Sequence, residues 1–107
     1  MARRRRPRVP ALSGQKVLAV AHHDRELATQ LRRAASSMPL NVAEGAQRQG
    51  RDRLQHYRIA AGSAAETRSA LQAARAWGYV GSRQVERVDA LLDRVVAILW
   101  RLTQPRV

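Results

Sequence analysis

Apolar residues repeat along this chain at steps of three and four, the spacing of helices that bury one face. The clearest example follows Gly81-Ser82, with apolar positions at Val85, Val88, Leu92, Val95, Leu99 and Leu102. This spacing predicts a last helix with a coiled-coil-like seam, which Pro105 ends. Leu91 and Ile98 form a second apolar flank, wider than one seam requires.

A second helix is predicted after Asp24, a residue well suited to cap a helix N-terminus. Its apolar stripe runs through Leu27, Leu31, Ala34 or Ala35, Met38, Val42 and Ala46. Pro39 falls inside this stripe, and proline normally ends or kinks a helix. Because the stripe keeps its phase across Pro39, one kinked helix over about residues 25–47 is expected.

A third helix is predicted from about Asp52 to Gly78, and it has two stripes. One consists of Leu54, Tyr57, Ala61, Ala64, Leu71 and Ala74, and the other of Ile59, Ser63, Glu66, Ala70, Ala73 and Trp77. Two stripes imply contacts on two sides of this helix. Tyr57 and Trp77 are therefore expected in the core, which leaves Tyr79 and Trp100 as the aromatic residues expected at the surface.

The start of the chain differs from the rest. Residues 1–10 contain five arginines, two prolines and no acid, which indicates a disordered arm. Residues 11–22 are apolar enough for a short first helix, although Gly14 weakens it. The chain is thus expected to be all-α, with residues 11–107 forming one antiparallel up-and-down four-helix bundle whose first helix is short.

Composition narrows the classes of protein. A length of 107 residues suits one domain, and the absence of cysteine excludes disulfides and thiolate metal sites. No run approaches the roughly 18 apolar residues of a membrane span, so a soluble, cytoplasmic protein without a membrane role is expected.

Charge points to a polyanionic partner. Twenty basic and eight acidic residues give a formal net charge of +12, and nucleic acid is the commonest partner of such a chain. Candidate contacts lie in the arm, at Arg32 and around the turn expected between the second and third helices. They are Arg3, Arg4, Arg5, Arg6, Arg8, Arg32, Arg48, Arg51, Arg53 and Arg58. Exposed aromatic residues are scarce, so backbone contact is expected in place of base readout. A solvated basic surface with no specific partner is the alternative.

Polar residues on the apolar stripes are the candidates for chemistry. Asn41 and Glu44 share a face of one helix, and Ser63 and Glu66 share a face of the next. Two facing carboxylates can act as an acid and base pair, but nearby arginines, among them Arg33, Arg58 and Arg68, offer ion-pair partners. A structural polar network is favoured because unpaired buried charge is costly. No Glu-x-x-His pair or nucleophile motif is present, so no enzyme, metal or cofactor is expected.

Two runs carry a resemblance to a known family: QLRRAASSMPLNVAEGAQR, residues 30–48, and YRIAAGSAAETRSAL, residues 57–71. Together they resemble a four-helix bundle family. Its members include proteins encoded in intervening sequences of bacterial 23S ribosomal RNA genes and accessory variability determinants of diversity-generating retroelements. The similarity spans roughly residues 27–104. The start of the chain departs from it, because a short glycine-containing segment and an arginine arm replace the usual longer first helix.

The resemblance implies a homopentameric barrel with a basic surface and, in the retroelement branch, a reverse transcriptase and its RNA as partners. It implies that the residues on the family's marked positions determine the fold: Arg33, Asn41, Glu44, Gly45, Gly62, Ser63 and Glu66. The sequence therefore predicts a homo-oligomer, expected to be pentameric, that binds RNA or RNA/DNA hybrid through arginine–phosphate contacts. An accessory scaffold for a reverse transcriptase is the alternative.

Overall fold

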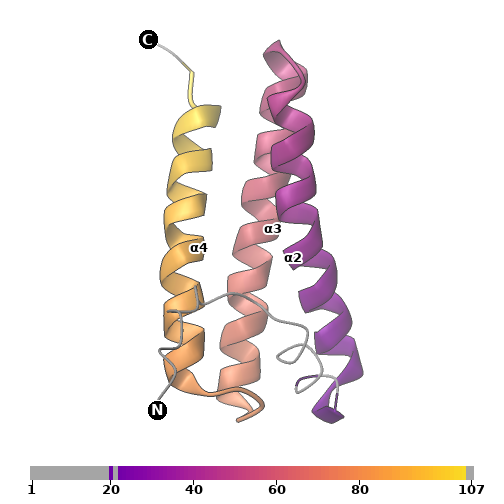
Figure 1. Ribbon diagram of the computed structural model, residues 1–107, viewed down its shortest axis with the longest axis vertical. Coiled ribbons are helices and arrows are strands. Elements are labelled where there is room, and N and C mark those ends of the chain that lie inside the picture. Colours follow the sequence, from indigo (N-terminus) through magenta and orange to yellow (C-terminus); the bar gives the residue numbers. More distant parts are fainter. Residues whose placement is uncertain (1–19, 21, 106–107) are drawn as a thin grey trace, which may run out of the picture.

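The computed structural model describes Val20 and residues 22–105. This part of the chain contains three helices and no strand: α2 (Arg25–Ala46), α3 (Gly50–Ala76) and α4 (Ser82–Thr103). Successive helices run in opposite directions and are joined by short turns (Figure 1). The all-α, antiparallel prediction is therefore confirmed.

The number of helices differs from the prediction. Three helices, not four, are found among the described residues, and most of the expected first helix over residues 11–22 lies outside them. Val20, His22 and His23 are helical, and the Asp24 N–H donates to the Val20 carbonyl at 2.7 Å. The predicted arm, residues 1–10, also lies outside the described residues.

The start of α2 follows the sequence prediction. Asp24 has an extended backbone, and its Oδ1 accepts a hydrogen bond from the Leu27 N–H at 2.9 Å. This bond satisfies one of the N–H groups that a helix leaves free at its first turn. Pro39 lies inside the helix without ending it. The prediction of one helix across Pro39 is confirmed.

Two glycines shape the turns around α3. Gly50 and Gly78 have φ of 59° and 76°, a backbone region that residues with a Cβ rarely adopt. Gly50 allows α3 to start with only three residues between it and the end of α2, slightly earlier than the sequence pattern suggested. Gly78 turns the chain after α3 and leads into α4.

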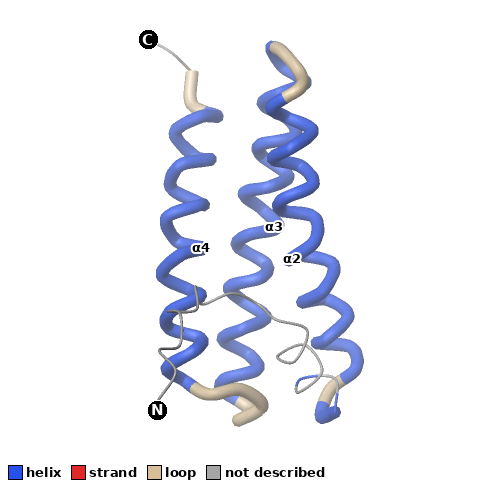
Figure 2. The backbone as a smooth tube through the Cα atoms, viewed as in Figure 1, coloured by secondary structure: helices blue, strands red, loops and turns tan. Residues whose placement is uncertain are grey.

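The core forms around α3, which packs against α2 on one side and α4 on another (Figure 2). Leu31 and Val20 are completely buried, and Leu71, Val85 and Leu92 belong to the same cluster. The alanines of α3 keep the helices close, because Ala60, Ala64 and Ala74 are fully buried. Contact on two sides of the third helix is thus confirmed.

Burial departs from the expected stripes at several positions. Val85, Leu92 and Leu99 of the α4 seam are buried, but Leu102 at its end is 51% exposed. On α3 the second stripe is only partly covered: Ser63 and Ala70 are buried, whereas Ile59, Glu66 and Trp77 are exposed.

The expectation that Trp77 is a core residue is wrong. Trp77 is 74% exposed, because α3 ends at Ala76 and the side chain lies beyond the last packed turn. Tyr57 is half-buried, and Trp100 is 65% exposed. Tyr79 is half-buried and stacks on His23 with ring centroids 4.9 Å apart.

Candidate nucleic-acid interface

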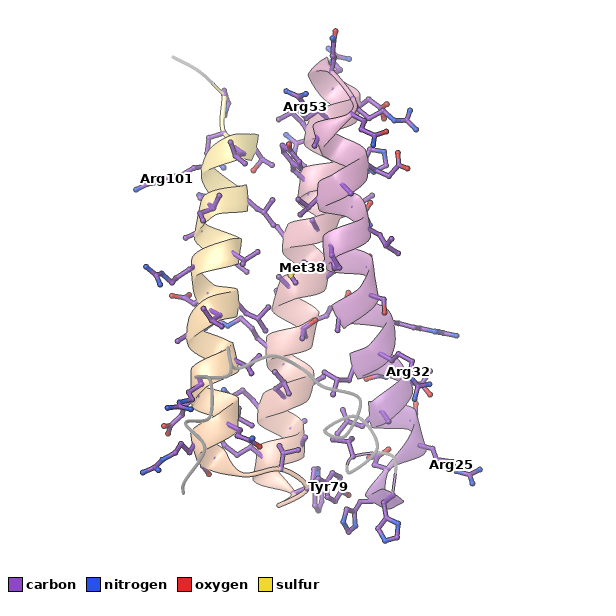
Figure 3. All side chains as sticks on the ribbon, viewed as in Figure 1. Arg25, Arg32, Met38, Arg53, Tyr79 and Arg101 are labelled. Atoms are coloured by element: carbon purple, nitrogen blue, oxygen red, sulfur yellow. The ribbon has the colours of Figure 1, made fainter. Side chains whose placement is uncertain are left out.

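Four of the arginines expected to bind nucleic acid lie around the turn between α2 and α3, at one end of the molecule, where Arg53 lies in Figure 3. The short turn brings the last turn of α2 beside the first turn of α3. The side chains of this cluster, Arg48, Arg51, Arg53 and Arg58, are all exposed. The structure gives them different surroundings.

Arg48 is held between two carboxylates. Its guanidinium donates to Asp52 Oδ2 at 3.0 Å and to Glu44 Oε2 at 3.3 Å, and all three side chains are about half exposed. The Asp52 carboxylate, and to a smaller degree that of Glu44, raises the pKa of Arg48. The two acids balance the charge of Arg48, so this residue adds little positive potential to the turn.

Arg53 caps the C-terminal end of α2. Its Nε donates to the Gly45 carbonyl at 3.0 Å, and its Nη2 donates to the Ala46 carbonyl at 3.1 Å. Carbonyls in the last turn of a helix have no partner within the helix and carry its negative dipole end, so a guanidinium there is favourable. Arg53 therefore acts as a C-terminal cap supplied by the next helix.

Arg51 and Arg58 form no ion pair with any described residue, and the same holds for Arg32 on α2. All three are exposed, and Arg32 points outward from α2 in Figure 3. These side chains can reach phosphates without first breaking an ion pair. The arm residues Arg3, Arg4, Arg5, Arg6 and Arg8 lie outside the described part of the chain.

A chain of hydrogen bonds joins α2 to α3 beneath this turn. His56 Nδ1 lies 3.0 Å from Asn41 Oδ1, and Asn41 Nδ2 donates to the carbonyl and hydroxyl oxygens of Ser37 at 2.9 and 3.1 Å. Ser63 Oγ donates to Ser37 Oγ at 2.8 Å. These partly buried side chains fix the register of α2 against α3, since a shift would leave several polar atoms unpaired.

Only two of the five residues expected in a polar network take part in it. Asn41 and Ser63 are joined through Ser37, whereas Glu44 turns outward to Arg48, and Arg33 and Glu66 are exposed. Ser37 and His56 are the members that the sequence analysis missed. A serine or histidine on a helix face has no distinctive spacing, so only the packing of the two helices identifies them.

Arg68 pairs with two aspartates of α4, and not with Glu44 or Glu66 as the sequence analysis considered. Its Nε donates to Asp89 Oδ1 at 2.8 Å, and its Nη1 donates to Asp93 Oδ1 at 2.9 Å. These hydrogen bonds raise the pKa of Arg68, and the bond from Arg68 holds the pKa of Asp89 below its ordinary value. This ion pair links the middle of α3 to α4 across the outside of their contact.

The described residues hold no group of three or more side chains able to bind a metal ion. Asn41, Ser63 and His56 are tied up in hydrogen bonds with one another or through Ser37. The exposed arginines Arg32, Arg51 and Arg58, by contrast, are available for contact. No helix of the described part is long and apolar enough to cross a membrane.

Comparisons with known proteins agree with this fold. A solved structure from Bacteroides thetaiotaomicron, a protein of unknown function from the S23 ribosomal protein family, matches with a TM-score of 0.75 and 21% identity. The match covers 85% of this chain and 87% of the other. No curated protein matches this chain. The model of the family described as 23S rRNA-intervening sequence protein matches residues 16–101. Since this match spans most of the 107 residues, the chain belongs to the family of 23S rRNA-intervening sequence proteins.

Proposed function

We propose that this chain is a non-catalytic, homo-oligomeric protein that binds RNA or an RNA/DNA hybrid through arginine–phosphate contacts. The observation that carries the proposal is that the ion pairs use many of the acidic side chains but few of the arginines. Four of the eight acidic residues are bound by two arginines, Arg48 and Arg68. The exposed cations elsewhere face few acids, which leaves a strong positive potential for a polyanion.

Arginine suits this role because its planar guanidinium donates two parallel hydrogen bonds to a phosphate. Arg32, Arg51 and Arg58 are the described members of the predicted set that form neither an ion pair nor a side-chain hydrogen bond with a described residue, since Arg48 is paired with two acids and Arg53 binds two carbonyls. Because exposed stacking aromatics are few, binding depends little on base sequence.

Self-association is supported by the apolar surface that one copy leaves uncovered. Ile59 on α3, Trp77 directly after it, and Ile98 and Leu102 on α4 are between 40% and 74% exposed. A groove between α2 and α3 is lined by Leu27 and Gln30 of α2 and by Ala65, Glu66, Ser69, Ala70 and Ala73 of α3. Large uncovered apolar patches mark interaction surfaces, and a second copy supplies a matching one. The resemblance to pentameric relatives makes five copies the expected number.

The experiment is a titration of unrelated RNA, DNA and RNA/DNA hybrid oligomers at several salt concentrations. If arm and turn arginines neutralise about six phosphates, log affinity falls against log salt with a slope near −5 on a duplex and a shallower one on a single strand. Deletion of residues 1–8 makes the slope several units shallower. Salt-independent affinity, or strong preference for one sequence, contradicts this mechanism.

A protein partner such as a reverse transcriptase is the second candidate, and the exposed Trp77 and Trp100 favour it, since tryptophan is enriched at protein interfaces. Under this alternative the chain is an accessory scaffold and holds nucleic acid incidentally. Absence of any nucleic-acid binding at low salt, together with a stable complex with a co-expressed reverse transcriptase, favours the scaffold.

A further inference from the structure

The outward face of α4 carries a stripe built only from arginine and alanine. Its members are Arg83, Arg87, Ala90, Arg94, Ala97 and Arg101, which follow one another at steps of four, three, four, three and four residues. At 3.6 residues per turn these six positions point within roughly 80° of one another, and the four arginines within about 40°. All six residues are exposed.

The stripe lies opposite the face by which α4 packs. Val85, Leu92 and Leu99 are buried, and at 100° per residue they point away from the arginines. Figure 3 shows Arg101 projecting outward from α4, away from α3. The packing of the helix thus leaves the arginine side chains in solvent.

Arg68 removes two acids from competition with this stripe. Of the three acidic residues of α4, Asp89 and Asp93 are bound by Arg68 of α3. Glu86 is the third, and it forms no ion pair with a described residue. None of the four arginines of the stripe is paired with a carboxylate of the described chain. Their charges are therefore available to an external anion.

The length and regularity of the stripe identify the kind of anion. Arg83 and Arg101 are eighteen residues apart, about 27 Å along a helix. A straight row of that length lies alongside roughly eight base pairs of B-form DNA, at about 3.4 Å per pair, and a comparable stretch of an A-form duplex. The alanines between the arginines let a rod-shaped polyanion approach the helix closely. A helix that lies in a membrane surface presents a continuous face of large apolar residues beside its cations. Beside this stripe the exposed large apolar residues, Ile98, Trp100 and Leu102, are confined to the last two turns of α4.

We infer that the Arg83, Arg87, Arg94 and Arg101 stripe of α4 is a contact surface for the phosphate backbone of a double-helical nucleic acid. This inference rests on the proposed function and adds a surface that the arm and the turn cluster do not include. Contacts spaced four, seven and seven residues apart along one side of a helix reach the phosphates of whichever strand faces them and read no bases. The stripe orients the helix along the nucleic acid, since its arginines are aligned with the axis of α4.

Salt-dependent binding by variants tests the inference. The quadruple variant R83Q/R87Q/R94Q/R101Q is expected to make the slope of log affinity against log salt shallower by about 3.5 on an RNA/DNA hybrid, if each arginine contacts one phosphate. R94Q/R101Q is expected to make it shallower by about 2. The matched control R25Q/R75Q removes the same charge from exposed positions on α2 and α3, and its slope is expected to stay close to that of the unaltered protein.

A second readout locates the contact without altering charge. The sequence has no cysteine, so Ala97→Cys carries a maleimide photocrosslinker at one position, between Arg94 and Arg101. This variant is expected to crosslink to a labelled hybrid, whereas Ser69→Cys, at an exposed position of α3 in the groove beside α2, is not. Circular dichroism and thermal melting verify that each variant is folded.

The outcomes separate this inference from the proposed function. If the unaltered protein binds nucleic acid but the quadruple variant keeps its salt slope and Ala97→Cys does not crosslink, the inference is overturned and the proposed function stands. If the unaltered protein binds no nucleic acid, the proposed function fails. Equal losses in R94Q/R101Q and R25Q/R75Q also overturn the inference, because net charge alone then explains binding. Binding of polyglutamate or anionic vesicles through the stripe, without nucleic acid, assigns the surface to another partner.

Discussion

The ring of Tyr57 fills the space where Gly45 lacks a side chain. A Cβ built on Gly45 lies 2.6 Å from Tyr57 Cε1 and 2.7 Å from Cδ1, both far inside contact distance. Gly45 is buried near the end of α2, and Tyr57 lies in the second turn of α3. The close approach of the two helices beside the arginine turn therefore requires glycine at this position.

Gly45→Ala is expected to lower the free energy of unfolding by about 1–2 kcal/mol, because overpacking costs more than the gain in helix propensity returns. Gly62→Ala is the matched control, since nothing lies within 4 Å of a Cβ there. It should be neutral or stabilise by up to about 1 kcal/mol. Urea unfolding of both variants measures the difference, and equal stability of the two would contradict the role of Gly45.

Contacts between helices, such as that of Gly45 with Tyr57, could not be predicted from the sequence. The three described helices, the cap at Asp24 and the passage through Pro39 follow from local spacing, and the structure has them. The contacts of Arg53 with α2 and of Arg68 with α4 depend on how helices pack. Trp77 was misplaced because its spacing fits a stripe although the helix ends before it.

The hydrogen-bond chain between α2 and α3 gives a second stability prediction. Ser63→Ala removes the donor to Ser37 Oγ and is expected to cost about 1 kcal/mol. Ser69→Ala, at an exposed position on the same helix, removes the same hydroxyl group and should be neutral or slightly stabilising. Thermal melting of the two variants under identical conditions measures the effect. A larger loss for Ser69→Ala would assign the stabilising hydroxyl to the groove and not to the network.

The Arg68–Asp89 ion pair predicts a loss of stability in acid. The pKa of Asp89 in the folded chain lies below its ordinary value, chiefly because Arg68 donates to it. This contribution is present above the unfolded pKa of aspartate and is lost as the pH falls through the lower folded pKa. Asp89→Asn is thus expected to be less stable than the unaltered protein at pH 7, with the difference shrinking below about pH 4.

Asp93→Asn is the control for this ion pair. Asp93 makes one hydrogen bond to Arg68 and its side chain is 67% exposed, against 24% for Asp89. Solvent screens the more exposed pair, so the effect at pH 7 should be smaller and more sensitive to salt. Unfolding measured from pH 3 to pH 7 distinguishes the two aspartates. A pH-independent difference for Asp89→Asn would show that packing, not charge, is responsible.

Association is predicted from the exposed apolar residues of α3 and α4. Light scattering at micromolar concentration should give a mass well above the 12.0 kDa of one chain. Leu102→Asp places a charge on an apolar side chain that is 51% exposed in one copy and lies about 100° around α4 from Arg101. It should shift the distribution towards single chains if this side of α4 is buried between copies. Gln84→Asp, at an exposed position of the same helix, should not. A mass of one chain under all conditions would refute self-association.

Within the arginine cluster at the turn, Arg53 is predicted to stabilise the fold and Arg51 to bind nucleic acid. Arg53→Ala leaves the Gly45 and Ala46 carbonyls without the guanidinium, and it should cost about 1 kcal/mol of stability. Arg51→Ala breaks no ion pair or hydrogen bond with a described residue, so its stability should stay within about 0.5 kcal/mol of the unaltered protein. For nucleic-acid binding, Arg51→Ala is expected to have the larger effect of the two. Arg51→Ala should make the salt slope shallower by about 0.9 on a duplex, the share of one phosphate contact.

Arg53 is engaged with α2, so its removal should change the slope less than removal of Arg51, once binding is measured well below the melting temperature. Arg53→Lys tests the geometry, because a lysine ammonium keeps the charge but cannot reproduce the two-pronged contact with both carbonyls. It should retain the salt slope while recovering only part of the stability. Equal effects of Arg51→Ala and Arg53→Ala on both quantities would mean that the cluster acts as one diffuse charge, and the capping contact would then have no separate role.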